Sequence, residues 1–137
     1  MEKGQICRIR DLSRALDTFS QLFESTFGIS LTQAIILCQL REQTDIGPGE
    51  LAAVLGLTGS HASKLIAQLE ERHLIRRKLC REDKRCMRFS LTGEGHKKLS
   101  DIESAELPVP EMDEAFAAAL FQQESDPVIR PAGRADE

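Results

Sequence analysis

Apolar residues in the first part of the chain recur at helical spacing. Between residues 6 and 27 they return every three or four positions, which places them on one face of an amphipathic helix. These positions are Ile9, Leu12, Leu16, Phe19 and Phe23. Residues 31–41 (LTQAIILCQLR) are apolar around almost the whole circumference, so they predict a buried helix that Ser30 or Thr32 caps. The first helix can pack on its own domain or on a second subunit.

Two short helices follow, separated by a tight turn. Residues 44–49 (TDIGPG) are a turn by composition, Pro48 suits the first turn of the next helix, and Gly56 ends that helix. Thr58 is a good N-cap for the second helix, whose apolar face holds Ala62, Leu65, Ile66 and Leu69. The opposite face holds Ser60, His61, Ser63, Lys64 and Gln68. Short polar side chains and a lysine at a helix N-terminus suit the base edges and phosphates of a DNA major groove. The alternative is an ordinary amphipathic surface helix.

Residues 75–91 predict a β-hairpin whose register follows from its two cysteines. When Cys80 faces Cys86, residues 81–85 (REDKR) form a five-residue loop. The pairs on one face are then Leu79 with Met87, Arg77 with Phe89, and Ile75 with Leu91. That face is mostly apolar and should pack inward. The helices and the hairpin together predict a winged helix-turn-helix, in a mainly α protein with a small β-hairpin wing.

The other face of the hairpin is basic. The same register places Lys78 opposite Arg88 and Arg76 opposite Ser90. Directly opposed like charges destabilise a sheet pair, so the Lys78–Arg88 pair requires an anion, which a DNA phosphate would provide. The loop adds three more basic residues, Arg81, Lys84 and Arg85. A wing that touches the minor groove is basic in this way. The alternative is a basic hairpin that is merely solvated.

The net charge of −4 is distributed unevenly. Residues 60–98 hold eleven Lys or Arg against five Asp or Glu, a local net charge of +6. The other residues hold seven basic and seventeen acidic groups, a local net charge of −10, and ten of those acids follow residue 99. A positive centre between acidic ends is typical of a phosphate-binding face on a body that otherwise repels DNA. A solvated charge cluster would give the same count.

The composition argues against several classes of protein. A chain of 137 residues is expected to form one domain with a real core. The absence of Trp and Tyr removes the stacking platform of many single-strand and RNA-binding modules. No apolar run approaches the ~20 residues of a membrane span and no signal peptide opens the chain, so we expect a cytoplasmic protein. No nucleophile motif, phosphate loop or carboxylate pair indicates an enzyme, and no cofactor is expected.

Across residues 31–99 the motifs resemble those of the MarR family of bacterial transcriptional regulators. In order, they are LTQAIILCQL, ELAAVLGL, HASKLIAQLEERHLIRR, EDKR and SLTGEG. The most specific are the D-x-R of the wing, at Asp83 and Arg85, and the LT-x-x-G at Leu91, Thr92 and Gly95. Each motif alone is a weak signal, and their order and spacing together carry the resemblance.

The resemblance implies a homodimer whose N- and C-terminal helices interlock. Each winged helix would read half of a near-palindromic, double-stranded DNA operator, with no membrane involved. The resemblance places the outward residues of the second short helix on the major groove and Arg85 at the minor groove, while Asp83 orients the wing through charged hydrogen bonds. With the hairpin included, the expected DNA contacts are Thr58, Ser60, His61, Ser63, Lys64, Arg76, Lys78, Arg81, Lys84, Arg85 and Arg88.

We expect four segments. They are a dimerisation helix at 1–30, the winged helix-turn-helix at 31–91, C-terminal dimerisation helices at 92–124, and a flexible tail at 125–137. Thr92 caps a helix to about residue 104, two prolines interrupt it, and EMDEAFAAALFQQ resumes as a short amphipathic helix. This arm is shorter than family members usually have. His73 also departs from the family, because relatives often have Gly at that helix end, where a left-handed conformation costs His more.

Cys80 and Cys86 suggest a redox function for the wing. They face each other beside several arginines, and nearby cations favour the thiolate. A reversible disulfide there would distort the wing and release DNA. The alternative is a pair of exposed, reduced thiols in a reducing cytosol.

The remaining cysteines carry weaker signals. A zinc site made of the wing cysteines with His73 and His96 would fit no known ligand spacing, so no metal is expected. Cys38 lies in an apolar helix and suits a small core residue. Cys7 is similar in position to the sensing cysteine of peroxide-responsive family members, but the tyrosines that support that cysteine are absent here.

The leading hypothesis is a homodimeric, operator-binding regulator, a repressor that a small ligand or oxidation releases. One alternative is a winged helix that serves as a protein-interaction module without DNA binding, with its acidic ends engaging the partner. The other is a thiol redox sensor acting through Cys80 and Cys86. A small-molecule effector would bind between the dimer helices and the winged domain, in a pocket of apolar residues.

Overall fold

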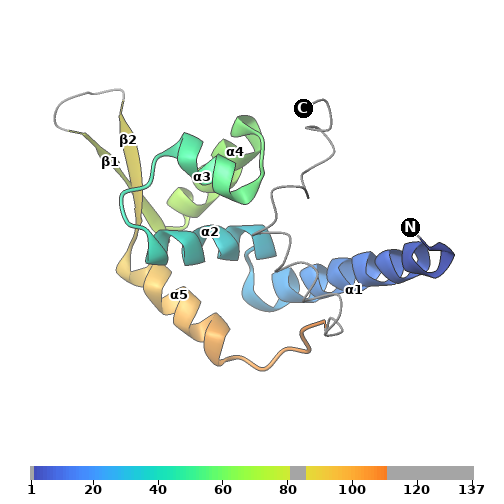
Figure 1. Ribbon diagram of the computed structural model, residues 1–137. Helices are drawn as coiled ribbons and strands as arrows, with labels where there is room; N and C mark the ends of the chain where they lie inside the picture. Colours follow the sequence, from blue (N-terminus) through green and yellow to red (C-terminus); the bar gives the residue numbers. More distant parts are fainter. Residues whose placement is uncertain (1, 81–85, 111–137) are drawn as a thin grey trace, which may run out of the picture. The chain divides into compact units, whose positions relative to one another are not determined.

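The structure is a computed structural model that describes residues 2–80 and 86–110 (Figure 1). It divides into two compact units, one made of residues 20–107 and one made of residues 1–19 with 108–137. The described elements, in order, are α1 (Lys3–Phe27), α2 (Leu31–Glu42), α3 (Pro48–Leu55), α4 (Gly59–Glu71), β1 (Ile75–Leu79), β2 (Met87–Leu91) and α5 (Gly93–Ser104). This is the mainly α fold with a small β-hairpin that the apolar pattern predicts. The predicted helix in EMDEAFAAALFQQ, the flexible tail and the loop 81–85 lie outside the described residues.

Helix α1 is long, and part of its apolar face is exposed. It starts three residues before the predicted boundary, and Phe23 is its one buried residue. Its large exposed apolar side chains are Ile6, Ile9, Leu16 and Leu22. Such a face, left open along a 25-residue helix, is available to a partner.

Helix α2 forms the centre of the core in residues 20–107. Ile36, Leu37 and Leu40 are almost completely buried. Ser30 caps the helix, as predicted, and with Gln33 it completes a capping box. The expectation of burial all around is wrong at Ile35, which is 46% exposed. Helices α3, α4 and α5 and strand β2 pack against α2 (Figure 1), but they leave Ile35 exposed.

Helices α3 and α4 form the predicted helix-turn-helix. Pro48 is in the first turn of α3, and Gly56 ends the helix in a left-handed conformation with φ of 68°. The Thr58 side chain then caps α4 by accepting a hydrogen bond from the His61 backbone N–H at 3.2 Å. Gly and Thr therefore set the tight turn that fixes the second helix against the first.

The hairpin has the predicted register at every pair. β1 and β2 are antiparallel, with Lys78 opposite Arg88 and Arg76 opposite Ser90. An isolated bridge from Ile46 to Phe89 ties the other edge of β2 to the turn before α3. The inward packing of the apolar face holds at the base of the hairpin, where Phe89 is 2% exposed, but fails at Leu79, which is 55% exposed. The prediction of inward packing is therefore wrong for Leu79.

The junction between α4, β1 and α5 explains the LT-x-x-G motif and the unusual His73. His73 adopts the left-handed conformation, with φ of 61°, and its carbonyl accepts a hydrogen bond from the Thr92 hydroxyl at 2.6 Å. The same hydroxyl caps α5 by accepting from the Gly95 N–H at 3.0 Å. A β-carbon at Gly95 would collide with the Leu74 carbonyl oxygen. The motif therefore lets α5 start directly against the turn that follows α4.

Candidate nucleic-acid interface

Helix α4 presents a polar face that is held outward by its buried side. Ala62, Ile66 and Leu69 are 3% exposed or less. The residues predicted to meet DNA, Ser60, His61, Ser63 and Lys64, are all exposed. Because the helix turns 100° per residue, the same packing that buries one face fixes the direction of the other. Gln68, on the polar side, is used internally: its side-chain oxygen accepts a hydrogen bond from the buried Gln33 at 2.8 Å.

The N-terminus of α4 adds an electrostatic contribution. No acidic residue lies in its first turn. The first N–H groups of a helix have no intrahelical partner, and they carry the positive end of the helix dipole. Thr58 satisfies only one of them, through the N–H of His61. This end can therefore approach a phosphate without meeting a like charge of its own.

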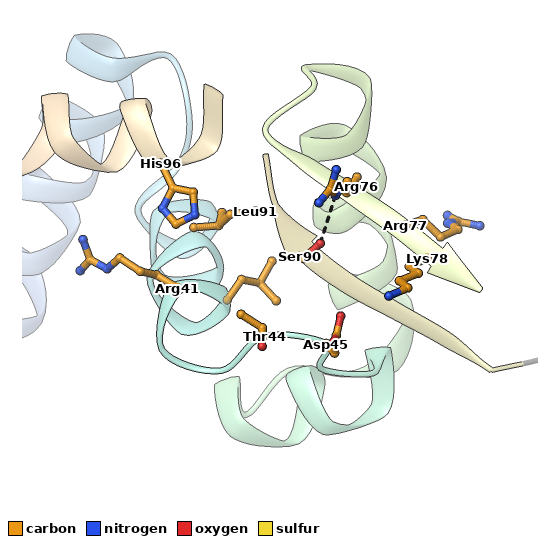
Figure 2. A pocket seen from close by; sticks show the side chains of 10 residues that line it. Arg41, Thr44, Asp45, Arg76, Arg77, Lys78, Ser90, Leu91 and His96 are labelled. Atoms are coloured by element: carbon orange, nitrogen blue, oxygen red, sulfur yellow. Dashed lines mark hydrogen bonds between the residues drawn. The ribbon is translucent and has the colours of Figure 1, made fainter. Parts of the chain in front are cut away.

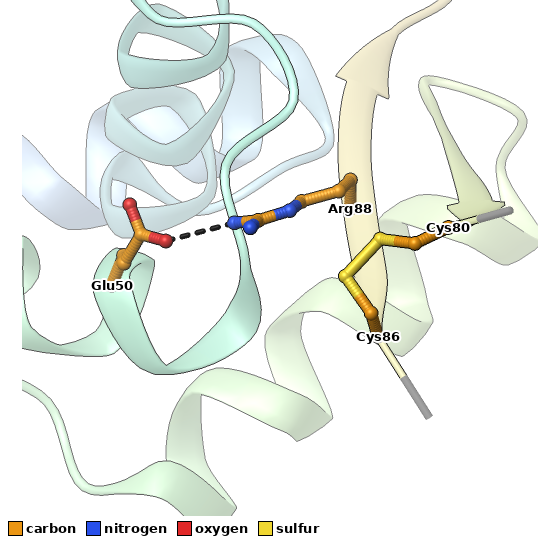
Figure 3. Close-up of a disulfide and its surroundings, with 4 residues drawn as sticks. All are labelled: Glu50, Cys80, Cys86 and Arg88. Carbon is orange, nitrogen blue, oxygen red and sulfur yellow. Dashed lines mark hydrogen bonds and ion pairs between the residues drawn. A yellow bond between two sulfur atoms is a disulfide. The ribbon is translucent and has the colours of Figure 1, made fainter. Parts of the chain in front are cut away.

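Two ion pairs join the hairpin to the helix-turn-helix. Arg88 Nη1 lies 2.8 Å from Glu50 Oε1 of α3 (Figure 3). Arg77 Nη2 lies 2.7 Å from Glu70 Oε1 of α4, and its guanidinium stands 5.9 Å from the centre of the Phe89 ring. A carboxylate of the same chain, Glu50, therefore lies beside Arg88 of the Lys78–Arg88 pair, and the expected contact of this pair with a DNA phosphate stays a prediction.

The ion pair between Arg88 and Glu50 could not be predicted from the local sequence pattern. The two residues lie 38 positions apart, and no short motif contains both. The contact of Arg77 with the Phe89 ring could be predicted in part, because the strand register places Arg77 opposite Phe89. Arg76 and Lys78 are exposed, and Arg76 Nε donates to the Ser90 hydroxyl at 3.4 Å.

Cys80 and Cys86 form a disulfide at the end of the described hairpin (Figure 3). Their Cα atoms are 5.3 Å apart, and the Cys80 N–H donates to the Cys86 carbonyl at 3.1 Å. The predicted juxtaposition is confirmed, and the two sulfurs are bonded rather than free. The wing residues Arg81, Asp83, Lys84 and Arg85 lie outside the described residues.

The other two cysteines are free thiols. Cys7 is exposed on α1, and Cys38 is half-buried, so the expected burial of Cys38 in the core is incomplete. Within residues 2–80 and 86–110, no three His, Cys, Asp or Glu side chains are grouped as a metal site requires. Nor does any helix in those ranges combine the length and apolar content needed to cross a membrane.

Comparison with known proteins gives consistent matches. The MarR family model matches residues 29–87. The transcriptional repressor MprA of Escherichia coli K12 is 33% identical over 73 residues, which are 53% of this chain and 42% of that protein. This chain therefore spans less than half the length of that relative.

Solved structures show the same fold. A cysteine-to-serine mutant of MarR from E. coli, complexed with operator DNA, superposes with a TM-score of 0.70 at 19% identity, covering 90% of this chain and 93% of that one. The transcriptional regulator SlyA superposes with a TM-score of 0.69 at 21% identity, covering 88% and 91%. Residues 29–87 therefore match the MarR family model, and the chain shares the winged-helix fold of these solved structures.

Proposed function

We propose that this chain is a cytoplasmic transcriptional repressor that binds a near-palindromic DNA operator as a homodimer and is released by a small ligand or by oxidation. The observation that carries the proposal is the outward face of α4. Small hydroxyl and imidazole groups and one lysine stand exposed at the helix N-terminus, on a segment with a local net charge of +6. The likeness to a repressor, and to a fold solved on operator DNA, supports the proposal.

The chemistry of this face suits sequence reading. Ser and His side chains exchange hydrogen bonds with base edges, and Lys64 adds a charge that neutralises one phosphate or contacts a guanine. The acidic remainder of the chain repels DNA, so binding concentrates on the winged helix. Thr58 and the hairpin cations Arg76 and Lys78 are proposed as further contacts.

The dimer is proposed from α1 and the C-terminal segment 92–124. Two of the five residues in the expected stripe of α1, Ile9 and Leu16, are exposed, and a second subunit would cover them. Two recognition helices related by a twofold axis would then read half-sites about one helical turn, or 34 Å, apart. Sedimentation equilibrium tests the dimer, and a monomer at micromolar concentration would contradict it.

Fluorescence anisotropy with the DNA upstream of the chain's own gene tests operator binding. We expect a steep loss of affinity with salt, because each neutralised phosphate contributes about one unit to the slope of log K against log salt. A shuffled duplex of equal length is the control. If neither duplex gives salt-dependent binding, the chain acts instead as a protein-interaction module.

Arg85 tests the proposed wing contact. Arg85→Ala should weaken operator binding and lower the salt slope by about one unit, as the loss of one phosphate or groove contact does. Ser63→Ala should instead change which operator variant is preferred. If both variants bind the same operator as the parent chain with unchanged affinity, the docking arrangement is wrong.

The disulfide favours a second candidate, a thiol redox sensor in the wing. Oxidation by a hydroperoxide would form the Cys80–Cys86 bond, with two electrons and two protons passing from the thiols to give an alcohol and water. Reduction would reopen the loop that the bond closes. Operator affinity should therefore differ between peroxide-treated and dithiothreitol-treated chain, and the difference should vanish in Cys86→Ser. Equal affinity in the two states of the parent chain excludes the sensor.

A further inference from the structure

The side chain of Gln68, on α4, is held by a chain of hydrogen bonds that starts at the N-terminus of α2. The Ser30 backbone N–H donates to Gln33 Oε1 at 2.9 Å, as part of the capping box of α2. Gln33 Nε2 then donates to Gln68 Oε1 at 2.8 Å. Gln33 is 7% exposed, so the inner part of this chain is shielded from water. The amide of Gln68 is therefore oriented from inside the domain.

The first donor fixes the polarity of this chain of hydrogen bonds. A backbone N–H only donates, so the Gln33 atom that faces Ser30 is the amide oxygen. The other arm of the same amide is an NH2 group, which only donates, so the Gln68 atom 2.8 Å away is an oxygen. The NH2 group of Gln68 is left over, and it has no hydrogen-bond partner among the described residues. The exposed side chain of Gln68 therefore offers two N–H donors.

Gln68 lies on the same stripe of α4 as two residues that are expected to contact DNA. It follows Lys64 by four positions and His61 by seven, which correspond to about one and two turns of an α-helix. All three side chains are exposed. The pocket at the base of the hairpin, which Arg76 and Lys78 help to line, includes no residue of α4 (Figure 2). The donors of Gln68 thus belong to the polar face of α4 and not to the hairpin pocket.

We propose that Gln68 reads a guanine at one position of each operator half-site, and that Gln33 sets this preference by holding the Gln68 oxygen. The inference rests on the proposed binding of an operator by α4. Guanine presents two acceptors in the major groove, N7 and O6, which suit an amide that offers donors. Adenine presents an acceptor beside an N–H donor, so its bidentate contact with glutamine needs a free amide oxygen. Because Gln33 holds that oxygen, the amide prefers guanine.

Selection from a library of DNA duplexes with a randomised centre tests the proposal on the whole chain. Duplexes bound by the parent chain and by each variant are recovered and sequenced. We expect the parent chain to enrich guanine over adenine about tenfold at one position of each half-site, as a good base contact does. Gln68→Ala should lose the preference at that position and keep the preferences at the other positions.

Gln33→Glu is the sharper variant, because it reverses the polarity of the hydrogen bonds. Glutamate at this position keeps the capping box with Ser30 and suits the positive end of the α2 dipole. At about pH 8 the carboxylate is ionised and only accepts, so the Gln68 amide must turn over and donate its NH2 group inward. The Gln68 oxygen then faces outward. The selected base should therefore change from guanine to a base that donates, adenine or cytosine.

Gln39→Glu is the matched control. It makes the same chemical change on the same helix, where the amide donates to Gln43 at 3.5 Å and not to a residue of α4. It should enrich the same bases as the parent chain. Thermal unfolding followed by circular dichroism checks the fold of each variant. If Gln33→Glu does not fold, Gln68→Ala still decides, because its side chain is exposed and its loss changes stability little.

Four results overturn the proposal. The same guanine preference in the parent chain, Gln68→Ala and Gln33→Glu shows that another residue reads that base. An equal loss of affinity for every duplex in Gln68→Ala assigns the amide to a phosphate. Adenine at the position that Gln68 governs in the parent chain shows that the amide oxygen reaches DNA. A parent chain that enriches no sequence contradicts the proposed operator binding as well, whereas the first three results leave that function standing.

Discussion

The recognition helix and the hairpin both turn polar or basic groups outward, but they hold those groups differently. Lys64 on α4 has no carboxylate within ion-pair distance among the described residues, and the hydroxyls and imidazole around it are exposed. On the hairpin, Arg77 and Arg88 each bind a carboxylate of the helix-turn-helix. The polar groups of α4 are therefore available to a partner, while two hairpin cations, Arg77 and Arg88, form ion pairs with the helix-turn-helix.

The two ion pairs between the hairpin and the helix-turn-helix orient the hairpin but add little to stability. Glu50 belongs to α3 and Glu70 to α4, so the two pairs clamp the hairpin to both helices of the reading unit. Exposed ion pairs contribute about 0–1 kcal/mol each, which is small beside the burial of Phe89 at the base of the hairpin. Apolar burial thus holds the wing in place, and the ion pairs orient it.

The largest expected effect separates the base of the wing from its tip. Phe89→Ala removes a ring that is 2% exposed and should destabilise the chain by about 3–5 kcal/mol. Leu79→Ala, on the same face of the hairpin but 55% exposed, should change stability by about 0.5 kcal/mol or less. Urea denaturation followed by circular dichroism measures both. Equal losses of stability in Phe89→Ala and Leu79→Ala would mean that the tip of the hairpin is packed as well as its base.

The next effect tests whether α4 is free to bind. Lys64→Ala should weaken operator binding about tenfold, as the loss of a base or phosphate contact costs about 1–3 kcal/mol. The same change should leave unfolding nearly unaltered, because the side chain is exposed. Lys97→Ala on α5 serves as the charge-matched comparison. Anisotropy titrations at several salt concentrations measure the affinity, and an unaffected Lys64→Ala variant would remove α4 from the interface.

Glu50→Gln releases Arg88 and should give a smaller effect. If Arg88 then meets a phosphate, the salt slope should steepen by up to about one unit and operator affinity should rise severalfold. Stability should change by less than about 1 kcal/mol, since both partners are partly exposed. Weaker operator binding in Glu50→Gln would show instead that the ion pair positions the wing for DNA.

Local pattern was sufficient for the helices, their caps and the strand register. Gly56, Thr58 and Thr92 act through backbone conformation and near neighbours, so their positions predict the turns directly. The register follows from a side-chain period of two, which leaves few ways to bring Cys80 opposite Cys86. Interactions between residues close in sequence were therefore enough to predict most of the fold.

The features that the sequence pattern did not predict depend on contacts between segments that lie far apart in the sequence. The pattern predicts Leu79 as an inward residue, but its side chain is 55% exposed. The ion pair of Arg88 with Glu50 could not be predicted from the hairpin sequence, because Glu50 belongs to another element. Arg76 and Lys78 were read as one face of a strand, yet the turn after α2 and the start of α5 turn that face into the wall of a pocket. In each case the surroundings of the side chain depend on a segment that is distant in the sequence.

The smallest expected effect extends the comparison to the ion pair between α2 and α5. Hydrogen bonding from Arg41 holds the pKa of the Glu103 carboxyl below its ordinary value, although partial desolvation opposes the shift. A carboxyl with a depressed folded-state pKa stabilises the fold above its unfolded pKa, and that contribution is lost as the pH falls through the folded pKa. Glu103→Gln should therefore lower the melting temperature slightly at pH 7 and make no difference once the pH lies below the depressed folded-state pKa of Glu103. Asp101→Asn, on the same helix without an ion pair among the described residues, should show no such pH dependence. A difference between Glu103→Gln and the parent chain that stays constant as the pH is lowered from 7 until the parent chain unfolds would mean that Glu103 acts through packing, and that α5 is attached to α2 as Phe89 attaches the wing, by burial rather than by charge.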